Sequence, residues 1–199
     1  LLGFTYFDTG EYDTAMQIFK EGLNQIKGKN DKSSKASLLH TIGIIHWKKG
    51  DNKKAIENLN ISLKNRNHIN DRQGIGNSHN VFGAVYFNMG DYKKAFKSFK
   101  KSFEIYNTLD HDMGKAQALD NLGVIDTINC NYNHALRHYK TSIQIKKKLE
   151  DNRGISFGLS NLGILYYKTG DYETALENYH QALKLSKSLN IKYAISNLM

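Results

Sequence analysis

The chain has 199 residues, with 28 Lys and Arg against 19 Asp and Glu, a net charge of +9, one cysteine and no proline. A single cysteine excludes an intramolecular disulfide framework, so the fold depends on packing. No apolar run approaches the roughly 18 residues of a membrane span, and no signal-peptide pattern opens the sequence. Because the first residue is not Met, we expect a segment of a longer protein.

A 40-residue period organises the sequence from its first residue onward. Three kinds of position recur at this spacing, namely glycine (Gly3, Gly43, Gly83, Gly123, Gly163), alanine (Ala15, Ala55, Ala95, Ala135, Ala175) and a large apolar residue (Phe19, Leu59, Phe99, Tyr139, Tyr179). The period predicts five repeats, at 1–30, 31–70, 71–110, 111–150 and 151–190, with the start of a sixth at 191–199.

Each repeat is predicted to form two helices. In the third repeat, apolar residues follow helical spacing up to Met89 and again from Ala95. Gly90 suits the left-handed backbone that ends a helix, and Asp91 is placed to cap the next one. The segment from Asp71 to Gly74 predicts a similar return turn. Neither helix buries its apolar face alone, so the repeats are expected to stack into a solenoid.

The turn in the fourth repeat differs, because Cys130 stands where the other four repeats carry glycine. We expect one of two outcomes. Either Cys130 adopts the left-handed conformation at a cost in strain, or Asn129 or Asn131 adopts it instead, since asparagine tolerates positive φ.

These residues resemble the tetratricopeptide repeat family. The segments that match its first-helix pattern are Leu2-Gly3…Tyr6, Phe82-Gly83…Tyr86 and Leu162-Gly163…Tyr166, and those that match its second-helix pattern are Ala15…Phe19, Ala95…Phe99, Ala135…Tyr139 and Ala175…Tyr179. The resemblance implies an all-α fold, a right-handed superhelical solenoid of antiparallel two-helix repeats that forms one domain over 1–199. The period exceeds the family's usual length of about 34 residues, so we expect longer helices or a longer return turn.

The most enzyme-like group is Cys130, His134 and His138. On a helix the outer two lie about 12 Å apart, too far to bind one metal ion at about 2.0–2.3 Å. Both histidines flank the core residue Ala135 and are expected in solvent. No phosphate-binding glycine motif and no combination of nucleophile and base can be assembled. The sequence therefore predicts no enzyme, no catalytic residue, no metal site and no cofactor.

Lysines gather on the second helices, at Lys93, Lys94, Lys97, Lys100, Lys101, Lys146, Lys147 and Lys148. The resemblance places these helices on the convex side, where a charge run is usually a solvated face. Aromatic residues on these helices fall at core spacing, so stacking on nucleic-acid bases is not favoured. Binding of nucleic acid or an anionic surface through this face remains the alternative function. Tyr12, Tyr92, Tyr132 and Tyr172 are each expected to pack against the adjacent hairpin.

A stripe on the first helices varies between repeats while the core positions do not. On a helical wheel of about 100° per residue, the stripe lies well away from the core. The resemblance places it in the concave groove, and its mixture of carboxamides and aromatic rings suits an extended or helical peptide. The candidate partner-binding residues are His40, Trp47, Lys48, Asn77, Asn80, Phe87, Asn88, Gln117, Asp120, Thr127, Ser160, Tyr167 and Lys168.

The predicted function is therefore binding of a protein or peptide in the concave groove. The 40-residue variant is similar to repeats of bacterial sensory and regulatory proteins, which implies a sensory or interaction domain of such a protein. Self-association through truncated terminal repeats is a further hypothesis for the partner. The expected location is cytoplasmic, or periplasmic if the segment belongs to a membrane-bound sensor.

Overall fold

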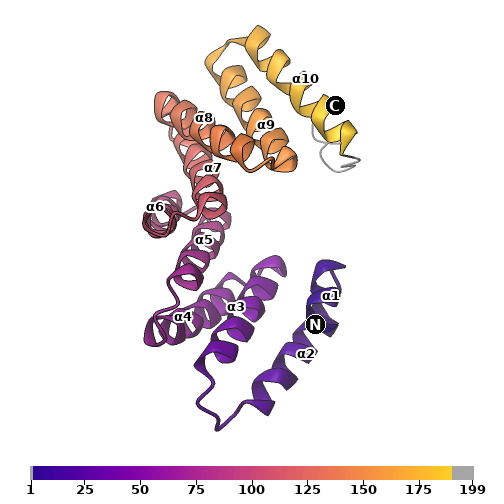
Figure 1. Cartoon of the computed structure of the whole chain (residues 1–199), viewed down its shortest axis with the longest axis vertical. Coiled ribbons are helices and arrows are strands. Elements are labelled where there is room, and N and C mark those ends of the chain that lie inside the picture. The colour runs from indigo at the N-terminus through magenta and orange to yellow at the C-terminus, as the bar shows by residue number, and fades with distance from the viewer. Residues whose placement is uncertain (1, 190–199) are drawn as a thin grey trace. The chain divides into compact units, whose positions relative to one another are not determined.

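The computed structural model describes residues 2–189, and these form ten α-helices and no β-strand (Figure 1). The helices are α1 (Leu2–Asp8), α2 (Tyr12–Gln25), α3 (Lys32–Lys48), α4 (Asn52–His68), α5 (Arg72–Asn88), α6 (Tyr92–Thr108), α7 (Asp112–Ile128), α8 (Tyr132–Lys148), α9 (Asn152–Thr169) and α10 (Tyr172–Ser188). The predicted all-α repeat solenoid is confirmed. The start of the predicted sixth repeat lies outside the described residues.

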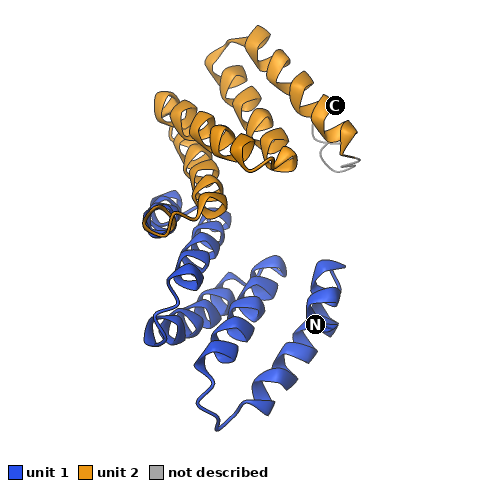
Figure 2. Ribbon diagram, viewed as in Figure 1, with its two compact units in different colours: residues 1–105 blue, residues 106–199 orange. Residues whose placement is uncertain are grey.

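Contacts divide the chain into two compact units, residues 1–105 and residues 106–199 (Figure 2). Helices that follow one another along the chain pack together, as α3 does with α4, α7 with α8 and α9 with α10. First helices of successive repeats also touch, because α3 contacts α5 and α7 contacts α9. None of the ten described helices combines the length and the apolar character that a membrane crossing requires.

The 40-residue period arises from longer helices. From α3 to α8 every helix has 17 residues, which is about 26 Å of helix, and each is joined to the next by three residues. The return turn at 69–71 is thus as short as the hairpin turn at 49–51. Of the two explanations expected for the long period, the structure supports the first.

Both kinds of turn use the same backbone conformation. The hairpin turns place Gly90 at φ 76° and Cys130 at φ 59°, and the return turns place Asn70 at φ 52°. Asn129 has φ −81°, so Cys130 itself adopts the left-handed conformation, the first of the two expected outcomes. After most of these left-handed positions the next residue caps the following helix, as predicted for Asp91, which accepts a 3.0 Å hydrogen bond from the Lys94 N–H. Glu11 and Asn131 make no such side-chain bond.

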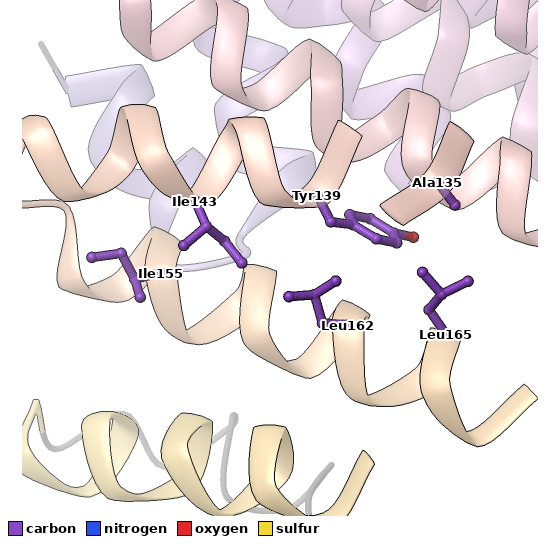
Figure 3. Packing of buried hydrophobic residues seen from close by; sticks show 6 residues of the cluster. All are labelled: Ala135, Tyr139, Ile143, Ile155, Leu162 and Leu165. Atoms are coloured by element: carbon purple, nitrogen blue, oxygen red, sulfur yellow. The ribbon is translucent and has the colours of Figure 1, made fainter. Parts of the chain in front are cut away.

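Glycine on the first helix lets a large ring of the second helix approach closely. A Cβ atom added at Gly123 would lie 2.5 Å from Cε1 of Tyr139, a separation that real Cβ atoms do not show. Tyr139 also contributes to the core between α8 and α9, where it lies with Ile143 opposite Leu162 and Leu165 (Figure 3). Burial raises the pKa of Tyr139 to about 12.

A buried serine joins the two helices of a hairpin. On the second helix, Ser62 Oγ donates to the Ala36 carbonyl at 2.7 Å, and Ser142 Oγ donates to the Ala116 carbonyl at 3.0 Å. In the fifth repeat the roles are exchanged, because Ser156 on α9 donates to the Ala182 carbonyl on α10 at 3.0 Å. The same two positions therefore carry the bond whichever helix supplies the hydroxyl.

Replacing Cys130 by glycine should raise the free energy of unfolding by up to about 1 kcal/mol, because glycine adopts positive φ without a Cβ penalty. The reciprocal Gly170→Cys substitution, at φ 84°, should lower it. Urea melts of both variants measure the effect. Equal stability of Cys130→Gly and the parent chain would contradict the assigned strain.

Replacing Ser142 by alanine should cost about 1 kcal/mol, because a buried hydrogen bond to the Ala116 carbonyl is lost. Adding Ala116→Ser should recover most of this loss, since the fifth repeat shows that a first-helix serine reaches the carbonyl opposite. Urea melts of the single and double variants measure the recovery. A double variant less stable than Ser142→Ala would show that the two arrangements do not exchange.

Candidate functional site

The first helices of the second unit, α7 and α9, line a cavity of about 540 Å³ together with the end of α8. Its lining residues are Met113, Gln117, Asp120, Lys146, Asp151, Arg153, Gly154 and Phe157. Gln117 and Asp120 belong to the stripe predicted from the sequence, and the structure brings them together here. The cavity therefore includes part of the predicted binding surface.

A buried ion pair forms one wall of this cavity. The Lys146 ammonium contacts the Asp120 carboxylate and donates to the Gly154 carbonyl at 3.1 Å. The Lys146 side chain is only 5% exposed. Burial raises the pKa of Asp120, and the Lys146 charge acts in the opposite direction. The expectation that Lys146 belongs to a solvated lysine run is wrong, because its side chain turns inward and joins α7, α8 and α9.

Exposed apolar and exposed polar side chains both line this cavity. Met113 is 47% exposed and Phe157 is 38% exposed, although both are large hydrophobic residues. Gln117 and Arg153 are exposed between them. Asp151, which also lines the cavity, caps α9 by accepting the Gly154 N–H at 2.8 Å. The sequence stripe did not include Met113, Lys146 or Arg153, because the cavity lies at a junction between repeats.

In the first unit, His40 lies against the second helix of its own hairpin. Its pKa falls from 6.5 to about 3, mainly through burial and then through the nearby Arg66 charge. Among the described residues, His40 Nδ1 has no hydrogen-bond partner. Arg66 is buried as well, and it donates to the Gly74 carbonyl and, at 3.2 Å, to Ser78 Oγ. His40 is therefore a neutral, half-buried group at a repeat junction.

Several aromatic residues predicted to line the groove contact other side chains of the protein. The Phe87 ring lies 5.6 Å from the Tyr92 ring, and the Tyr167 ring lies 5.5 Å from the Tyr172 ring, centroid to centroid. Each tyrosine opens the second helix of the same hairpin. Tyr12 and Tyr132, in contrast, pack against clusters that include residues of the next hairpin, as expected. Trp47 packs against the cluster that contains Leu59 and Phe82 and is covered by the Lys48 ammonium at 4.5 Å.

The remaining stripe residues divide by exposure. Asn77, Asn88, Lys48 and Lys168 are exposed, and Asn80 and Ser160 are half-buried. Ser160 Oγ donates to the Ser156 carbonyl at 3.0 Å. Thr127 is buried, and its hydroxyl donates to the Gly123 carbonyl at 2.8 Å, so this side chain does not reach a surface.

The histidines of the fourth repeat also differ from expectation. His134 is exposed, but His138 is half-buried, with Nδ1 3.0 Å from the Asp126 carboxylate. Burial lowers the pKa of His138, and the Asp126 charge raises it. The prediction that His138 lies in solvent is wrong, because Asp126 occupies the first-helix position where three other repeats carry tyrosine. Within residues 2–189, no group of three side chains is arranged to hold a metal ion.

Sequence profiles described as tetratricopeptide repeat match residues 1–25, 36–65, 74–148 and 116–188. The chain therefore belongs to the tetratricopeptide repeat family, as the motifs suggested. Proteins with this fold are typically non-enzymatic scaffolds, and the chain is a scaffold of the kind that mediates protein interactions. No curated protein sequence matches it significantly.

Solved structures share the fold at low sequence identity. Apo RapI has 16% identity and a TM-score of 0.88, with 98% of this chain and 72% of that chain covered. A Rap protein complexed with competence and sporulation factor has 16% identity and a TM-score of 0.87, with 98% and 55% covered. BtubC from P. vanneervenii has 18% identity and a TM-score of 0.81, with 96% and 79% covered. The chain thus spans about half of the Rap protein in the complex.

Replacing Lys146 by alanine should lower the free energy of unfolding by about 3 kcal/mol, because the Asp120 carboxylate is left buried without its partner. The matched control is Lys147→Ala, since Lys147 is exposed and one residue away. Urea melts compare the two. Combining Lys146→Met with Asp120→Asn should recover much of the loss, and equal losses for Lys146→Ala and Lys147→Ala would contradict the buried pair.

Proposed function

We propose that the chain is the peptide- or protein-binding interaction domain of a bacterial signalling or regulatory protein, with no chemistry of its own. The partner lies along the first helices. The cavity between α7 and α9 carries the proposal, because it is the place where exposed apolar side chains and a carboxamide meet in one hollow. A protein of similar fold has been solved with a bound factor, which supports the same mode of use.

The chemistry of the cavity suits a peptide segment. The Gln117 carboxamide offers donors and an acceptor, so it pairs with a main-chain amide whatever the side chain. Met113 and Phe157 flank it and would hold one apolar side chain of the partner, with methionine adapting to its shape. The buried pair of Asp120 and Lys146 keeps this part of the wall rigid.

The first unit offers the same kind of polar contact through Asn77 and Asn80, which lie one turn apart on α5. Its aromatic residues are less available, since Phe87 contacts Tyr92 and Trp47 packs on the core. We therefore assign the apolar anchoring of the partner to the second unit. The main-chain contacts beside this anchor are assigned to Gln117 of the same unit.

The alternative, an anionic partner on the second helices, has weaker support. Lys97, Lys100 and Lys101 are exposed on α6, but Phe99 and Tyr106 on the same helix are buried. The rings of Phe99 and Tyr106 are therefore not available to stack on bases beside these lysines. The lysines serve as the comparison surface in the test below.

Replacing Gln117 and Phe157 together by alanine should weaken binding of peptides selected on the parent chain from a random library. The expected loss is about tenfold or more, the usual effect of removing an aromatic anchor at an interface. Fluorescence anisotropy with the labelled peptides measures it, and circular dichroism shows whether helicity is retained.

The matched control replaces Lys100 and Lys101 by serine, and peptide affinity should not change. If the lysine variant loses the peptides and the Gln117 and Phe157 variant keeps them, binding is on the second helices and the proposal is wrong. A library that yields no peptide of saturable affinity would also contradict it.

A further inference from the structure

The connection between α2 and α3 departs from the regular three-residue turns. α2 has 14 residues, whereas α4, α6, α8 and α10 have 17 each. Six residues, 26–31, then lead to α3, with Gly28 at φ 84° (Figure 1). A cavity of about 310 Å³ is lined by residues of this connection together with residues of α2, α3 and α4.

This cavity has an aliphatic floor and a cationic rim. Its lining residues are Leu23, Ile26, Leu39 and Ile61 on the floor, and Lys27, Gly28, Lys29 and Lys35 around them. No Asp or Glu belongs to the lining. Ile61 is 46% exposed, and all three lysines are exposed. An apolar surface and three like charges therefore face one small space.

Within residues 2–189, no ion pair engages Lys27, Lys29 or Lys35. The neighbouring acid is Asp31, which caps α3 by accepting the Ser34 N–H at 2.9 Å. Hydrogen bonds to Ser34 lower the pKa of Asp31, and the Lys29 charge adds to this effect. Asp31 therefore stays ionised beside Lys29 and offsets one of the three lysine charges, which leaves the rim with a net positive charge.

The volume sets the size of a ligand. A water molecule takes about 30 Å³ in the liquid, so 310 Å³ is the space of about ten water molecules and admits a small organic ligand. Small-molecule sites are typically apolar with a few convergent polar groups, which is the arrangement found here. An alkyl group would cover the floor, and an anionic head group would lie among the ammonium groups.

We propose that this cavity binds a small aliphatic carboxylate, with its alkyl group on Leu39 and Ile61 and its carboxylate among Lys27, Lys29 and Lys35. The site lies in the first unit and is independent of the peptide cavity between α7 and α9. Two sources share this chemistry, a medium-chain fatty acid and the C-terminal residue of a peptide that ends in leucine.

Octanoate, which has ten non-hydrogen atoms, is the probe, and isothermal titration calorimetry at constant ionic strength measures its binding. We expect saturable binding of octanoate, binding of octanol weaker by about tenfold from loss of the charge-assisted contacts, and none of octylamine. Absence of saturable octanoate binding overturns the proposal. Octanol binding as tightly as octanoate also overturns it.

Variants locate the site. Changing Lys27, Lys29 and Lys35 together to glutamine should weaken octanoate by about tenfold, whereas the matched change of Lys97, Lys100 and Lys101 should not. Ile61→Thr should weaken it by about fivefold through loss of apolar contact. Threonine is tolerated at this position, since Thr141 holds the corresponding place in the fourth repeat. Unchanged affinity in the first triple variant overturns the assignment.

Two further ligands separate the sources. N-acetylleucine binding more tightly than octanoate would identify a peptide C-terminus, and the reverse order would identify a fatty acid. Either order supports the carboxylate site, provided that N-acetylleucinamide binds more weakly than N-acetylleucine. The Gln117 and Phe157 double variant should bind octanoate normally, so failure of the peptide proposal leaves this one testable.

Discussion

The contact that the rest of the structure depends on is a glycine facing a large side chain. Within a hairpin, Gly123 leaves room for Tyr139, and a Cβ atom there would lie 2.5 Å from the ring. Because glycine has no Cβ atom, the two helices pack close together. The serine hydroxyl of one helix then reaches a main-chain carbonyl of the other, as Ser142 does with Ala116. Because packed interiors tolerate little added volume, this contact sets the register of each hairpin. The turns then need only reverse the chain.

At the junction between repeats a glycine again faces a large side chain, but here that side chain is aromatic in one repeat and cationic in two others. Arg66, Tyr106 and Lys146 occupy corresponding positions at the end of a second helix, each opposite a glycine of the next first helix. A Cβ atom at Gly154 would lie 3.0 Å from Cδ of Lys146, and one at Gly114 would lie 2.6 Å from the Tyr106 ring. The size of the side chain is constrained, but its charge is not. A buried cation therefore enters the fold and requires a partner such as Asp120.

This distinction explains what the sequence predicts and what it does not. Helices and turns can be predicted from residue types that recur once in each hairpin. Gly90 and Asp91 indicate a helix end and a helix cap even when the neighbouring repeats are not considered. The cavity between α7 and α9 depends on three helices of two repeats, and no single period reports it. Lys146 cannot be told from Lys147 by composition, yet one is buried and the other exposed. Thr127 falls on the surface stripe of the wheel but is drawn into the interior, where its hydroxyl lies 3.3 Å from that of Tyr139.

The cavity between α7 and α9 lies at a junction between two repeats, and the cavity at the 26–31 connection lies where the regular three-residue turn is absent. In the described hairpins a glycine faces a large side chain of the partner helix, as Gly43 faces Leu59 and Gly123 faces Tyr139. Between α7 and α9 the junction cation is neutralised by Asp120, and the surrounding surface is left for apolar and amide contacts. At the 26–31 connection the regular turn is lost, and three lysines gather around an aliphatic floor with no carboxylate in the lining. The two cavities therefore differ in local charge balance although both lie on the same repeat scaffold: Asp120, Asp151, Lys146 and Arg153 balance in the first, whereas the second is lined by lysines alone among charged residues.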